Sequence, residues 1–145
     1  MKQIILLIMF LLVLTSCKKD SSNPVTTGDS GLIGTWNLTS ISGSTPQGAI
    51  TIPPTTAGIS MTMKFNSNNT TSMSMVQQGV TTNEDFKWST SNGNVSLTPT
   101  IGGTASILPY TLTGNKADVN FSSIIPGISY NGVTVTNLVF EFTKQ

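Results

Sequence analysis

Few side chains in this sequence of 145 residues suit acid–base or nucleophilic catalysis. The chain has no His and a single Cys, Cys17. Glu84 and Asp85 are adjacent, so they would point to opposite faces of a strand or lie in a turn. Neither arrangement suits a pair of catalytic carboxylates. Because the usual acid–base groups are missing or badly placed, we expect that the protein is not an enzyme.

Four methionines could do a different kind of chemistry, because a thioether sulfur is a soft ligand that can bind reduced copper. Met61 and Met63 alternate with polar residues, and so do Met73 and Met75. Such side chains also fill irregular space in a core or line a pliable apolar pocket. Core filling is the simplest interpretation, an apolar ligand pocket is the second and a copper site is the third. With neither His nor a free Cys, we predict no metal site and no cofactor.

The N-terminus has the layout of a secretory signal peptide. Lys2 precedes an uninterrupted apolar run of 11 residues, 4–14, and small polar residues follow it up to Cys17. A helix that crosses the hydrocarbon layer needs about 20 residues, so this run is too short to span it. Residues 14–17, Leu-Thr-Ser-Cys, resemble the lipobox of bacterial lipoproteins, in which the peptide before the Cys is removed and the Cys is acylated. The alternative is a free Cys that follows an ordinary signal peptide.

The resemblance to lipoproteins implies a lipid anchor. Acyl chains such as palmitate on Cys17 would hold the protein on a membrane without spanning it. In lipoproteins, a residue other than Asp after the Cys implies sorting to the outer membrane, and here that residue is Lys18. Which face of the outer membrane carries the protein stays open. Residues 1–16 are then a signal peptide, 17–31 an acylated Cys with a flexible polar tether, and 32–145 one folded domain.

The charge of the mature chain is balanced. Without Lys2 it carries six Lys against six acidic residues. Since no basic face is available, we expect no nucleic-acid partner. The lipid anchor makes a membrane the partner that the sequence predicts most directly.

Nearly all of residues 32–145 alternates polar and apolar positions, which is typical of antiparallel strands with one solvated face. The Pro- and Gly-containing residues 43–56 are expected to form a long connection. The apolar parity changes near residues 136–137, which predicts a bulge in the last strand. We expect strands at 34–42, 58–65, 71–78, 80–90, 94–99, 105–113, 116–123, 127–130 and 133–143.

Short turns fix the register between neighbouring strands, so residues that pair across a turn must share a face. Each turn of this sequence places apolar residues opposite one another. The expected pairs are Trp88 with Leu97 across Asn92-Gly93, Tyr110 with Val119 and Leu108 with Phe121 across Gly114-Asn115, Ile128 with Val135 across Asn131-Gly132, and Met63 with Met73 and Met61 with Met75 across residues 66–70.

Consecutive hairpins of this kind indicate an all-β meander. Closing it into an up-and-down barrel of about eight strands would remove its exposed edges. A two-sheet β-sandwich is the alternative.

Gly34-Thr35-Trp36, at the start of the first expected strand, resembles the Gly-x-Trp that opens the lipocalin barrel. In lipocalins this Trp plugs the closed end. Together with the meander that follows it, residues 31–145 are similar to the lipocalin-like domains of bacterial outer-membrane lipoproteins. Lipocalins also place an Arg from a late strand over the Trp. This chain has no Arg, and Lys144 is the nearest stand-in.

Two functions follow, because a barrel of about eight strands can either fill its interior with side chains or hold one small ligand. The first is a membrane-tethered module that binds a small apolar molecule inside the barrel. The second is a non-enzymatic interaction or structural lipoprotein, whose core is filled and whose surface contacts an envelope protein or a glycan. The candidate pocket residues for the first are Trp36, Met61, Met63, Met73, Met75, Trp88, Tyr110, Phe121, Phe140 and Phe142.

Overall fold

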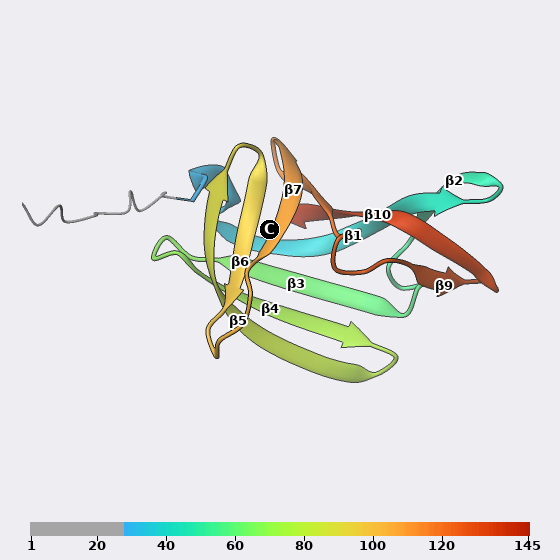
Figure 1. Cartoon of the computed structure of the whole chain (residues 1–145), viewed down its shortest axis with the longest axis horizontal. Helices are drawn as coiled ribbons and strands as arrows, with labels where there is room; N and C mark the ends of the chain where they lie inside the picture. The colour runs from blue at the N-terminus through green and yellow to red at the C-terminus, as the bar shows by residue number, and fades with distance from the viewer. Residues whose placement is uncertain (1–27) are drawn as a thin grey trace, which may run out of the picture.

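The computed structural model describes residues 28–145, in which nearly all the regular secondary structure is β-strand (Figure 1). Cys17, the signal peptide and most of the expected tether therefore lie outside the described residues. A short 3-10 helix, η1 (Ser30–Leu32), comes first. The strands that follow are β1 (Gly34–Thr45), β2 (Gly48–Ile52), β3 (Ile59–Phe65), β4 (Thr70–Gln77), β5 (Val80–Ser91), β6 (Asn94–Pro99), β7 (Ser106–Thr113), β8 (Lys116–Asn120), β9 (Ile128–Tyr130) and β10 (Val133–Lys144). No helix among these residues is long and apolar enough to span a bilayer.

The strands form one antiparallel sheet that closes on itself. Their order is β2-β1-β3-β4-β5-β6-β7-β8-β10-β9, and β1 also pairs with β10. Eight strands thus make a closed barrel, and β2 and β9 are additions to it. Closure leaves each of the eight with a neighbour on both sides, which confirms the barrel and excludes the sandwich.

The two additional strands extend β1 and β10 beyond the barrel. β1 pairs with β3 through residues 34–37 and with β2 through residues 41–45. β10 likewise pairs with β8 through residues 139–143 and with β9 through residues 133–135. The result is a four-stranded projection, β2-β1-β10-β9, at one side of the barrel (right in Figure 1).

The hairpin registers predicted from the turns are largely confirmed. Trp88 pairs with Leu97 across a turn in which Asn92 and Gly93 have φ values of 50° and 72°. Positive φ at both central residues gives a type I′ turn, whose twist matches that of the strands. The confirmed pairs also include Tyr110 with Val119, Ile128 with Val135, Met63 with Met73 and Met61 with Met75.

One predicted pair does not form. The β7–β8 ladder reaches Tyr110 and Val119, and β8 ends at Asn120. Phe121 does not face Leu108 across this ladder, because its backbone turns toward β10 and its N–H donates to the carbonyl of Leu138 at 3.0 Å.

The predicted bulge in the last strand is confirmed. Ser42 pairs with Val139 and Ser44 with Thr136, so β10 uses one residue more than β1 over this interval. Asn137 has a φ of 52°, the left-handed conformation that a bulge permits.

The long connection expected at residues 43–56 was the wrong interpretation for most of that segment. β1 continues to Thr45, and β2 pairs with it antiparallel so that Ile52 lies opposite Ile41. Both Ile side chains are fully buried. The Pro residues that suggested a loop lie in the turn before β2 and directly after it, where a missing N–H costs no ladder hydrogen bond.

The packed chain also begins before residue 32, where we expected the domain to start. Gly28 contacts the ring of Trp88, and the N–H of Asp29 donates to the hydroxyl of Thr90 at 2.8 Å. The Asp29 side chain in turn caps η1 by accepting from the N–H of Gly31. Residues 28–31 therefore lie on the barrel, although their polar composition suggested a tether.

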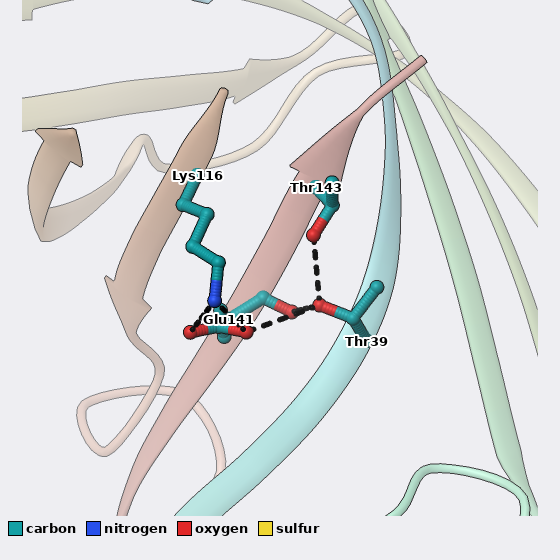
Figure 2. A network of polar contacts seen from close by, with 4 residues as sticks. All are labelled: Thr39, Lys116, Glu141 and Thr143. Carbon is teal, nitrogen blue, oxygen red and sulfur yellow. Dashed lines mark hydrogen bonds and ion pairs between the residues drawn. The ribbon is translucent and has the colours of Figure 1, made fainter. Parts of the chain in front are cut away.

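A polar network crosses the outside of the seam where the barrel closes (Figure 2). Lys116 on β8 forms an ion pair with Glu141 on β10 at 3.2 Å. Thr39 on β1 donates to the Glu141 carboxylate at 3.4 Å and lies 3.2 Å from the hydroxyl of Thr143. Because these groups are exposed, the ion pair contributes at most about 1 kcal/mol. The network links the three strands that meet at the closure.

Candidate ligand-binding pocket

The Trp of the Gly-x-Trp motif closes one end of the barrel. Trp36 is 1% exposed, and its indole N–H donates to the carbonyl of Leu32 at 2.7 Å. The ammonium of Lys144 lies 5.4 Å from the Trp36 ring centroid and donates to the carbonyl of Gly31 at 3.0 Å. Lys144 thus lies over Trp36, in the position where lipocalins place an Arg.

The backbone explains why Gly precedes this Trp by two residues. Gly34 has a φ of 135°, which side chains rarely adopt, and a Cβ there would lie 2.7 Å from Cε of Lys144. Gly34 therefore gives the Lys144 side chain room to reach Trp36.

The N-terminal segment lies across the same end. The phenol of Tyr110 donates to the carboxylate of Asp29 at 3.0 Å. Burial of the ring, reinforced by the hydrogen bond and the charge of Asp29, raises the pKa of Tyr110 above its ordinary value of 10.0. Together with the contact between Asp29 and Thr90, this bond fixes the first described residues over the closed end.

The closed half of the barrel is filled with side chains. The space left among them is an apolar cavity of about 20 Å³, which is the size of a single water molecule. It is lined by Leu32, Trp36, Met63, Phe65, Val95, Leu97, Leu108, Tyr110, Ala117, Val119, Phe121 and Phe142. A cavity of this size and composition is a packing imperfection of the core and too small for an organic ligand.

The opposite half contains a much larger cavity, of about 300 Å³. This volume is at the lower end of the range for small-molecule pockets, about 300–1,000 Å³. It is lined by Met61, Met73, Met75, Glu84, Phe86, Leu97, Pro99, Ser106, Phe121, Ile124 and Ile125. Leu97 and Phe121 border both cavities, so they form the floor between the filled half and the hollow half. We call the larger cavity the mouth pocket.

Methionines form one wall of the mouth pocket. Met61 on β3 and Met75 on β4 pair directly across the ladder, and Met73 follows on the same face of β4. Met61 is 4% exposed, whereas Met73 and Met75 are half-buried. Unbranched thioether side chains at a half-buried wall can change rotamer to fit ligands of different shape.

The loop after β8, which begins at the floor residue Phe121, forms the opposite wall. The Phe121 ring packs against Phe140 with a centroid distance of 4.7 Å. Ile124 and Ile125 follow in the loop, where their N–H groups both donate to the carbonyl of Phe121. Ile124 is 47% exposed, so an apolar side chain stands at the rim of the pocket.

Four of the ten predicted pocket residues line the mouth pocket, namely Met61, Met73, Met75 and Phe121. The others lie deeper. Trp36, Met63, Tyr110 and Phe142 border the small cavity at the closed end. Trp88 packs edge-on against Phe65 at 5.1 Å, and Phe140 packs against Phe121; both are buried core residues.

Sequence reasoning did not identify seven residues that line the mouth pocket, namely Glu84, Phe86, Pro99, Leu97, Ser106, Ile124 and Ile125. The first three could have been found, because the register across Asn92-Gly93 already placed Phe86 opposite Pro99 and Glu84 shares the parity of Phe86. The two Ile residues lie in a loop with no periodic signal.

A closed antiparallel meander of eight strands, plugged by a Trp at one end and hollow at the other, defines the class of small up-and-down barrels that can hold a ligand. The chain belongs to the lipocalin-like domain family, whose sequence model matches residues 32–116. Among solved structures, a similar one is the crystal structure of the lipoprotein YedD from Klebsiella pneumoniae subsp. pneumoniae MGH 78578. It is 14% identical, the match covers 77% of this chain and 75% of that chain, and the TM-score is 0.42. No curated protein matches the chain.

Proposed function

We propose that this lipocalin-like protein binds a small apolar molecule in the mouth pocket. The observation that carries the proposal is a cavity of about 300 Å³, walled mainly by Met, Phe and Ile, in a barrel whose other half is packed. Burial of apolar ligand surface contributes about 25 cal/mol per Å², which makes such a cavity a favourable environment for an apolar molecule.

We also propose that the protein is a lipid-anchored lipoprotein of a bacterial outer membrane, held by acyl chains on Cys17, and that its role is not catalytic. The lipobox and the signal-peptide layout support the anchor. The register supports a non-catalytic role, because Glu84 pairs with Met73 on the inward face of β5 whereas Asp85 pairs with Ser72 on the outward face.

A fluorescent apolar probe tests the binding proposal. N-phenyl-1-naphthylamine, which is uncharged, should bind the wild-type protein with a fluorescence increase that saturates. Met73→Trp fills the pocket and should abolish this increase. Ile107→Trp adds the same side chain at an outward, 62% exposed position of β7 and should leave the binding unchanged. Equal binding by the wild type and Met73→Trp would contradict the pocket assignment.

The alternative function is that of an interaction protein that contacts an envelope protein or a glycan. The four-stranded projection favours it, because β2 and β9 are edge strands that extend past the barrel and can pair with another chain. Deletion of β9 residues should abolish partner capture without affecting probe binding if this alternative holds.

A further inference from the structure

Glu84 places a carboxylate at the apolar mouth pocket. It lies on β5 opposite Met73 of β4, on the same face as Phe86, and it lines the cavity together with Met61 and Met75. The other lining residues are apolar apart from the hydroxyl of Ser106. The pocket therefore combines an apolar body with one negative charge.

The inward faces of the described barrel strands carry only two charged side chains, one at each end. Lys144 lies over Trp36 at the closed end, and Glu84 is at the open end. The other charged residues of these strands have the outward parity; they are Lys64, Asp85, Lys87, Lys116, Asp118 and Glu141. An acidic side chain at an inward position is thus an exception in this barrel, because most inward positions carry apolar side chains and the polar ones, such as Thr71 and Gln77, are uncharged.

Glu84 has no counter-ion among the described residues, where the one ion pair joins Lys116 and Glu141 on the outside of the seam. A carboxylate beside an apolar cavity attracts a cationic group and repels an anionic one. A ligand that places its chain among the methionines and its cation at Glu84 would satisfy both parts of the pocket.

We propose that Glu84 selects for charge, so that the mouth pocket takes an apolar molecule with a cationic amine or ammonium group and disfavours fatty acids. This inference rests on the proposed function, since it assigns the polarity of the ligand to the same pocket. The cation would lie at the rim, beside Glu84, with the apolar chain directed toward Leu97 and Phe121 at the floor.

The test compares three probes with the same decyl chain: decyltrimethylammonium, undecanoate and uncharged decanol. Each is titrated calorimetrically into the protein, the two charged probes below their micellar concentrations and decanol below its solubility limit. We expect decyltrimethylammonium to bind about fivefold more tightly than undecanoate, which corresponds to the upper end for an exposed charge pair. Glu84→Gln should abolish this preference without affecting decanol, and Glu84→Lys should reverse it. Asp85→Asn removes the same charge one residue away, on the outer face, and should retain the preference.

The outcomes test the role of Glu84 and the existence of the mouth pocket separately. Equal binding of the two charged probes to the wild type, or a preference that survives Glu84→Gln, would overturn the role of Glu84 and leave the pocket itself in place. Failure of all three probes to bind the wild type would overturn the mouth pocket as a ligand site and the inference with it.

Discussion

The ammonium of Lys144, the penultimate residue, lies 5.4 Å from the ring centroid of Trp36 and also donates to the carbonyl of Gly31 at 3.0 Å. One side chain from the end of β10 thereby joins the start of β1 to the segment that crosses the closed end. Because this contact does not involve the mouth pocket, it supports the stability of the barrel without contributing to ligand contacts.

Lys144→Met should therefore destabilise the fold with little effect on binding. The loss of the cation–π contact and of the hydrogen bond to Gly31 should lower the free energy of unfolding by about 1–2 kcal/mol. Urea denaturation followed by Trp fluorescence measures it. Lys87→Met, at an exposed outward position of β5, is the matched control and should change stability by less than about 0.5 kcal/mol. Equal stability of the two variants would contradict the role assigned to Lys144.

Two methionines that face each other across the β3–β4 ladder should differ in how much stability the protein loses when each is replaced by the larger Trp. Met63 is 3% exposed and borders only the 20 Å³ cavity, so Met63→Trp should overpack the core and lose about 1–3 kcal/mol. Met73 is half-buried at the 300 Å³ mouth pocket, so Met73→Trp should change stability by less than about 1 kcal/mol. Thermal and urea unfolding of both variants measure the difference. A Met63→Trp protein as stable as the wild type would mean that the closed half is not packed as described.

Tyr110 should titrate at higher pH than an exposed phenol. Its folded pKa lies above the unfolded value of about 10, so the stability linked to this group is fully present below pH 10 and is lost as the pH rises through the folded pKa. The chain has two Tyr, so the tyrosinate absorbance of a Tyr130→Phe variant reports Tyr110 alone. Asp29→Asn in this background should lower the Tyr110 pKa only in part, because burial, the largest cause, remains. A Tyr110 that titrates at the ordinary value would argue against the buried contact with Asp29.

Cys17→Ser should release the protein from membranes. Cys17 lies outside the described residues, and the prediction rests on the lipobox and on the signal-peptide layout before it. In bacterial fractions, the wild type should sediment with membranes and incorporate labelled palmitate, whereas the variant should do neither. Ser21→Ala, four residues further along, should behave as the wild type. Membrane association that persists in Cys17→Ser would disprove the anchor.

Much of the barrel could be predicted from the sequence because short turns make strand register a local property. Asn92-Gly93 and Asn131-Gly132 each set a ladder without reference to the rest of the chain. β2 was missed because its position is not a local property. Its short apolar pattern is flanked by prolines, and it pairs with the part of β1 that also pairs with the distant strand β10. The polar segment at residues 28–31 gave no sign of packing, because its partners Thr90 and Tyr110 are far along the chain.

The division of the candidate site into a filled half and a hollow half was beyond sequence reasoning. Met63 and Met73 have the same residue type and the same inward parity, and they pair directly. What separates them is the cavity that each borders, which depends on the closure of all eight strands. Ile124 and Ile125 complete the mouth pocket from a loop, where position follows from tertiary packing and not from periodicity.

The proposed function requires that the open half of this barrel holds a small apolar molecule. Native mass spectrometry can detect such a bound molecule. The sample is protein without residues 1–17, exported to a bacterial periplasm by an unrelated signal peptide and purified without detergent. We predict a discrete additional mass that disappears on denaturation and is absent from the Met73→Trp variant. A clean apo mass for the wild type, together with no uptake of decanol or of N-phenyl-1-naphthylamine, would contradict the claim and favour the interaction protein.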